Sequence, residues 1–109
     1  MFKKELVKIC KERGIDPESI NVCVSIVTAD EIRALKKQHL GLDVYTDVLS
    51  FPMLDLKKGQ IPTRELFPLD FNQETRKIEL GDIVINEEEL DKPALFIHGL
   101  LHLLGEHHK

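Results

Sequence analysis

Histidines near the carboxyl end of the chain have the spacing of metal ligands. His98 and His102 stand four residues apart in an apolar run, so a helix would project both from one face. Gly105 can end that helix and reverse the chain, which would return His107 or His108 toward the same face. Three imidazoles around one point favour a divalent cation, above all zinc with one position open for water. The pattern predicts a small metal-dependent hydrolase.

A simpler interpretation explains each histidine separately. One histidine in an apolar stretch is usually a core residue bonded to a backbone carbonyl, and a terminal His-His-Lys can be a solvated tail. The i, i+4 pair followed by a further histidine beyond a glycine fits the metal interpretation better. Gly99 occupies the position at which zinc proteases of the His-Glu-x-x-His type have their glutamate base. This argues against peptide hydrolysis, and a cation with three neutral ligands suits phosphodiester cleavage instead.

Carboxylates near the histidines are candidates for proton transfer. Glu106 lies in the expected turn between ligands, and Asp82 and Asp47 each lie beside an expected strand. The more ordinary role is an exposed loop carboxylate for Glu106 and a turn or capping residue for Asp82. The substrate phosphate offers a further route for the proton.

Composition indicates one cytoplasmic globular domain over residues 1–109. Apolar residues make up 42% and charged residues 31%, with no run long enough to span a bilayer and no apolar signal segment at the start. The net charge of −4 argues against a general polyanion binder. Cys10 and Cys23 are expected to be ordinary buried thiols. Basic residues gather near the start and again about twenty residues later, on the expected outer faces of two helices: Lys3, Lys4, Lys8, Lys11, Arg13, Arg33, Lys36 and Lys37.

Periodicity predicts an α+β fold with a small mixed sheet packed with helices. The final helix is apolar on nearly every side, so we expect it to be the buried centre of the core and to carry the histidines. Thr28 and Glu31 match a capping box. The expected elements are helices over 2–13, 29–39 and 92–104, strands over 21–28, 48–51 and 82–86 with 77–80 leading into the last, and a loop over 53–75 with room for a hairpin arm.

Three blocks of the sequence resemble the YbeY family, the metal-dependent endoribonucleases and rRNA maturation factors of bacteria. The ending is similar to the family signature His-Gly-x-Leu-His-Leu-x-Gly-x-x-His. The segments 46–52 (Thr-Asp-Val-Leu-Ser-Phe-Pro) and 81–85 (Gly-Asp-Ile-Val-Ile) are similar to two strands of that family.

The resemblance implies a ligand set, an activity and partners. It assigns the metal to His98, His102 and His108, and it makes Thr46, Asp47 and Ser50 candidate substrate contacts. The implied cofactor is one zinc ion, although imidazoles also serve nickel and other divalent ions. The implied activity is cleavage of single-stranded RNA, in maturation of the 16S rRNA 3′ end and ribosome quality control. The implied partners are small-subunit ribosomal proteins and a ribosome-assembly GTPase.

The chain also departs from the family pattern. His39-Leu40 stand where the family usually has Tyr-Arg, so the arginine associated with substrate binding or catalysis is replaced by an uncharged residue. Two other functions therefore stay open: a non-catalytic ribosome-assembly factor with a structural metal, and a hydrolase of another phosphoester or amide. Further departures are Tyr45 in place of proline, Glu106-His107 in place of Tyr-Asp, and the short segment 86–92.

Overall fold

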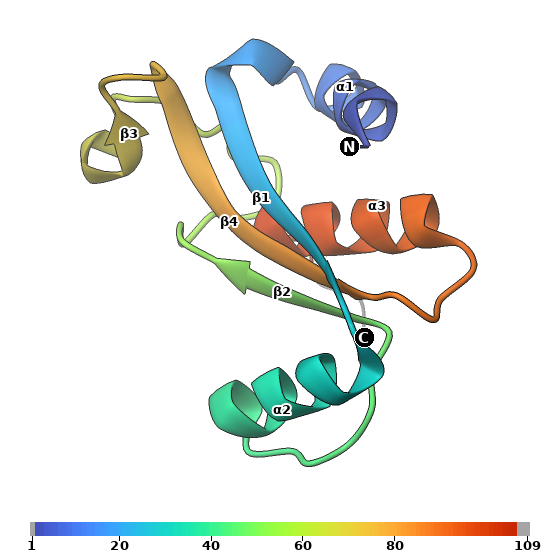
Figure 1. Ribbon diagram of the computed structural model, residues 1–109. Helices are drawn as coiled ribbons and strands as arrows, with labels where there is room; N and C mark the ends of the chain where they lie inside the picture. Colours follow the sequence, from blue (N-terminus) through green and yellow to red (C-terminus); the bar gives the residue numbers. More distant parts are fainter. Residues whose placement is uncertain (1, 107–109) are drawn as a thin grey trace.

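The longest strand, β4 (Lys77–Asn86), forms the centre of a mixed sheet. On one side it pairs in parallel with β1 (Ile20–Val27), and on the other it pairs antiparallel with β2 (Val48–Pro52) and with the short β3 (Phe71–Asn72). The computed structural model describes residues 2–106. Figure 1 shows the helices arranged around this sheet. The expected α+β class with a small mixed sheet is confirmed.

A bulge in β4 keeps its apolar side chains on one face. Ile78 and Leu80 precede Gly81, Ile83 and Ile85 follow it, and all four apolar residues are buried in one core cluster. Side chains alternate between the two faces of a strand, so even and odd positions would normally point apart. The register with β1 shifts by one residue at this place, which restores a common face. The two strand segments expected at 77–80 and 82–86 are therefore one bulged strand.

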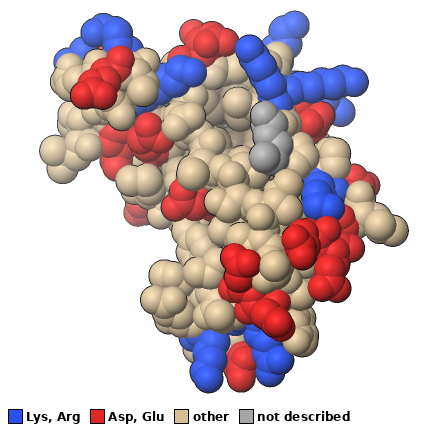
Figure 2. Space-filling model, in the orientation of Figure 1, with Lys and Arg blue, Asp and Glu red and all other residues tan. Residues whose placement is uncertain are grey.

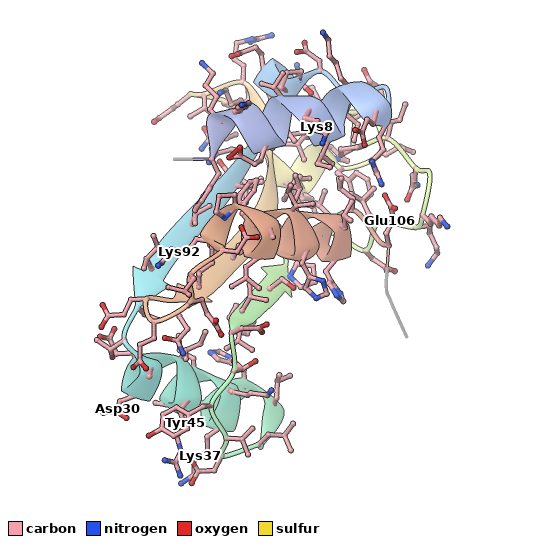
Figure 3. All side chains as sticks on the ribbon, turned by 90° about the vertical axis from the view of Figure 1, so that its right-hand side faces the viewer. Lys8, Asp30, Lys37, Tyr45, Lys92 and Glu106 are labelled. Carbon is pink, nitrogen blue, oxygen red and sulfur yellow. The ribbon has the colours of Figure 1, made fainter. Side chains whose placement is uncertain are left out.

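Two helices build the main core and a third covers the opposite face of the sheet. Helix α3 (Lys92–Leu103) packs on β2 and β4, and α1 (Lys3–Glu12) packs on α3. Helix α2 (Ala29–Leu40) packs on the other face through Ile32, against Leu49 and Val84. Figure 3 shows α1 and α2 at opposite ends of the molecule with α3 between them. Short 3-10 helices occupy Pro17–Ser19 and Pro68–Asp70.

Helix α3 leaves one stripe uncovered, which corrects the expectation of burial on nearly every side. Phe96, Leu100 and Leu103 are buried against the sheet and α1. Ala94 and His98 are exposed, and the stripe continues through half-buried residues: Ile97, Leu101 and His102. A helix held between a sheet and one other helix is covered on two sides only, so the third side reaches solvent. The histidines of α3 therefore lie on its accessible side.

The close contact between α3 and β4 depends on glycine. A Cβ atom built on Gly99 would lie 2.9 Å from Cγ2 of Ile83, which is closer than side chains approach one another. Gly99 costs helix stability of about 1 kcal/mol relative to alanine, and the contact with the sheet offsets that cost. This explains why a glycine stands between the two histidines.

Most local expectations are confirmed, and one concerning cysteine is wrong. The Thr28 hydroxyl caps α2 by accepting from the N–H of Glu31 at 3.1 Å, and the Asp91 carboxylate caps α3. The long loop contains the hairpin arm, because β3 pairs with the start of β4. Cys10 is buried, but Cys23 is exposed because its side of the edge strand β1 is not covered by α2. Among the described residues, every helix is too short or too polar to span a bilayer.

Gly81→Ala is expected to destabilise the fold more than a glycine change at an open turn. The residue has φ of +142°, and a Cβ atom there would lie 2.3 Å from the carbonyl oxygen of Phe51. We expect a loss of about 2–4 kcal/mol in the free energy of unfolding, from backbone strain and steric overlap together. Chemical denaturation measures the effect.

The matched control is Gly59→Ala, since Gly59 also has a positive φ but has no atom within 4 Å of the added Cβ. Equal losses for the two variants would show that the bulge does not constrain the sheet.

Candidate metal centre

Two of the three expected metal ligands converge in the structure. The Nε2 atoms of His98 and His102 lie 3.2 Å apart, and the ring centroids lie 4.6 Å apart. Two nitrogens bound at about 2.0–2.1 Å to a tetrahedral zinc ion lie roughly 3.3 Å from each other. The separation also permits an imidazole–imidazole hydrogen bond. The spacing of the pair therefore fits two ligands of one divalent cation.

The third expected ligand, His108, lies outside the described residues, as does His107. Within residues 2–106, no three histidine, cysteine, aspartate or glutamate side chains form a group able to hold a metal. The metal-carrying role of the C-terminal helix is therefore a prediction that rests on two side chains of α3 and one beyond it.

Ser50 is the expected substrate contact that lies on the same face of the sheet as α3. It pairs with Ile83 across β2 and β4, and directly opposed residues share a face. Ile83 contacts Gly99 of α3, next to His98 in sequence. The Ser50 side chain is therefore placed in the same layer as the histidine helix.

Thr46 and Asp47 are held through their backbone by a buried asparagine. The side-chain amide of Asn86 donates to the carbonyl of Thr46 at 3.1 Å, and its backbone N–H donates to the carbonyl of Asp47 at 2.9 Å. The Asp47 carboxylate accepts from the N–H of Val48 at 2.7 Å. Asn86 is only 7% exposed and was not singled out from the sequence. A polar residue at the end of an apolar strand was the available signal.

Asp82 lies on the opposite face of the sheet from the histidines. It pairs with Phe51 and shares the side of Val84, the face that α2 partly covers. Its neighbour across β1 is Cys23. Partial desolvation raises the pKa of the Cys23 thiol, and the hydrogen bond to Asp82 raises it further. The structure does not bring Asp82 together with the histidine pair.

Glu106 forms an ion pair that the sequence did not predict. The Arg13 guanidinium donates to both oxygens of the carboxylate, with Nε–Oε2 at 2.5 Å and Nη2–Oε1 at 2.9 Å. The side chains are only 28% and 18% exposed, and the pair raises the pKa of Arg13. Figure 3 places Glu106 beyond the end of α3. The pair therefore ties the end of α1 to the turn after α3.

Gly105 allows the turn after α3 to approach the segment around Leu56 closely. It has φ of +86°, and a Cβ atom there would lie 2.2 Å from the carbonyl oxygen of Leu56. The turn after α3 is thus fixed from two sides, by the segment around Leu56 and by Arg13.

Comparison with known proteins decides the family. The sequence profile described as endoribonuclease YbeY matches residues 1–109. The chain belongs to the YbeY family. A relative from Dehalococcoides mccartyi, named endoribonuclease YbeY, is 35% identical over 122 residues that cover 99% of this chain and 69% of its own length.

Other YbeY relatives are similarly distant. Those from Caldicellulosiruptor saccharolyticus and Listeria welshimeri, with the same name, are 34% and 33% identical, covering 86% and 84% of this chain. The chain covers 64% and 62% of their lengths, so it spans about two thirds of the relatives that it matches. The resemblance expected from the three sequence blocks is confirmed.

A double-mutant cycle on Arg13→Met and Glu106→Gln is expected to give a coupling energy of about 1–2 kcal/mol. Each N–H bond to a half-buried charged group is stronger than an exposed contact, and the two bonds are parallel. Thermal or denaturant unfolding of the four proteins measures the coupling.

The control cycle uses Arg33→Met and Asp43→Asn, because that pair has a similar Nε–Oδ1 distance of 2.8 Å but is exposed. We expect a clearly smaller coupling energy there, because solvent screens an exposed ion pair. If the coupling energy of Arg13 and Glu106 is no larger than that of Arg33 and Asp43, the Arg13–Glu106 pair does not fix the turn.

Proposed function

We propose that this protein is a metal-dependent endoribonuclease that cleaves single-stranded RNA in rRNA maturation. One observation carries the proposal: in a YbeY-family chain, the imidazoles of His98 and His102 converge to 3.2 Å on the accessible side of α3. The relatives that match most of this chain are named endoribonuclease YbeY. The proposed metal ligands are these two histidines and His108, and zinc is the proposed ion.

The chemistry of the site divides between the cation and the side chains around it. A divalent ion with three imidazole ligands supplies a Lewis acid for a phosphodiester. The Ser50 hydroxyl, in the same layer, supplies a hydrogen bond to the RNA backbone. Glu106 stays a candidate for proton transfer, although its contacts with Arg13 suit positioning of the turn. We assign no proton transfer to Asp82, because it lies on the other face of the sheet.

A second candidate function is ribosome assembly without cleavage, and Leu40 favours it. This residue stands where the family usually has arginine, and its side chain is 57% exposed at the end of α2. An apolar side chain provides no hydrogen bond or charge to a phosphate. Binding to small-subunit proteins or to a ribosome-assembly GTPase stays a prediction of the family resemblance, as does a cytoplasmic location.

His98→Ala and His102→Ala are expected to abolish stoichiometric zinc and RNA cleavage while the fold is retained. Removing one of three ligands leaves the ion with too few donors, and both side chains lie on the accessible stripe, so little packing is lost. Metal analysis, circular dichroism and cleavage of a labelled single-stranded RNA, with and without chelator, measure the three properties.

The control is Gln38→Ala, which changes an exposed polar residue on α2, away from the helix that carries the pair. Wild-type metal content in a His98→Ala/His102→Ala double variant would refute the metal site. Metal binding without cleavage in the native protein would favour the assembly function.

Leu40→Arg is expected to tighten RNA binding and to make it more dependent on salt. One added phosphate contact increases the slope of log K against log salt by about one. Fluorescence anisotropy at several salt concentrations measures the slope.

The matched control is Leu42→Arg, two residues away and 52% exposed. If the salt dependence of RNA binding increases equally in Leu40→Arg and Leu42→Arg, the effect is one of general charge. That result would contradict a specific phosphate contact at residue 40.

A further inference from the structure

A cavity of about 500 Å³ lies on the face of the sheet opposite the histidines. Its floor is formed by the sheet and its wall by α2. The volume is in the range of small-molecule sites. The lining residues are Ser25, Leu35, His39, Phe51, Asp82 and Val84.

Two rings of the cavity form an open aromatic corner. The His39 and Phe51 ring centroids lie 4.9 Å apart, and their planes are tilted by 55°. Phe51 is half-buried and His39 is exposed, so the rings meet where the cavity opens to solvent. With Leu35 and Val84, they give the cavity apolar walls. Flat aromatic and apolar surfaces of this kind stack on the bases of single-stranded RNA.

The polar groups of the cavity select the edge of a base rather than a phosphate. Asp82 contributes a carboxylate that only accepts hydrogen bonds when ionised, and Ser25 contributes a hydroxyl. A carboxylate repels a phosphate but accepts two parallel N–H bonds where two donors are adjacent. Guanine presents that arrangement at its ring N–H and 2-amino group. The Cys23 contact leaves further acceptor positions on the carboxylate, which has about four.

The cavity is connected to the histidine side through the edge strand β2. Phe51 lines the cavity, whereas the preceding residue, Ser50, lies on the α3 face. Within residues 2–106, β2 pairs with β4 alone, so its other edge has no strand partner there. Figure 2 shows basic side chains at the top of the molecule, over α1 and the β3 arm, and at the bottom, over α2, with many acidic side chains between these ends.

We propose that this cavity is a guanine subsite, in which an unpaired guanine of the RNA substrate stacks on His39 and Phe51 and bonds to Asp82. The inference rests on the proposed function for its substrate class. It extends that function by placing base selection on the face of the sheet opposite the metal ligands, with β2 between the two.

Nucleotide binding with chelator present tests the subsite, because no cleavage occurs. The probes are guanosine, inosine and adenosine monophosphates, and a labelled oligouridylate with or without one central guanosine. We expect GMP to bind about tenfold more tightly than inosine monophosphate, which lacks the 2-amino group. We also expect the single guanosine to tighten oligonucleotide binding about tenfold. NMR shifts should be concentrated at Ser25, His39, Phe51 and Asp82.

Two variants separate the contributions of hydrogen bonding and stacking. Asp82→Asn should remove the preference for GMP over inosine monophosphate. His39→Ala should weaken the binding of every nucleotide about tenfold and keep that preference. Glu79→Gln and Gln38→Ala are the matched controls, since they change neighbouring groups on β4 and α2 that do not line the cavity. Both controls should bind as wild type.

Several results would overturn the subsite. One is a wild-type preference for guanine over inosine in Asp82→Asn. Another is a loss of that preference in Glu79→Gln as large as in Asp82→Asn. A third is a set of NMR shifts centred outside the cavity. Free GMP binding as tightly as the guanosine-containing oligonucleotide would instead identify a free nucleotide as the occupant. Cleavage that persists without any base preference would refute the subsite alone, and base preference without cleavage would refute only the proposed function.

Discussion

Helix α3 rests on β4 at a point where neither element has room for another carbon atom. Gly99 contacts Ile83 there, and the geometry of the histidine pair follows from this contact. Because His98 precedes the glycine and His102 lies one turn beyond it, seating the glycine on the sheet directs both imidazoles toward the open side of the helix. The same residue therefore explains the shape of the core and the accessibility of the candidate ligands.

The parts of the fold that were predictable are those governed by short-range patterns. The cap at Thr28, the helix periods and the β-branched strands each depend on neighbours within a few residues, and the structure agrees with them. The spacing of His98 and His102 was informative for the same reason, since a helix converts a separation of four residues into proximity. Assignment of the third ligand came from the family signature, because nothing local distinguishes His107 from His108.

The contacts that sequence reasoning missed join residues far apart in the chain. Arg13 was placed among solvated cations, yet it pairs with Glu106, ninety-three positions away. Asn86 connects the end of β4 to the segment before β2. Asp82 was considered with the histidines because no local pattern gives the face of a strand that contains a bulge. The exposure of Cys23 has a related cause, since it depends on how far α2 extends over the sheet.

The bulge at Gly81 also limits how this lineage can change length. Removing one residue from β4 would restore strict alternation, so Ile83 and Ile85 would turn outward and Asp82 would turn toward the helix with the imidazoles. A deletion in the exposed connection around Leu90 would shorten a loop without exchanging the two sides of the sheet. Shortened homologues can therefore arise by losing material between secondary structure elements, whereas the number of residues in the central strand is fixed by geometry.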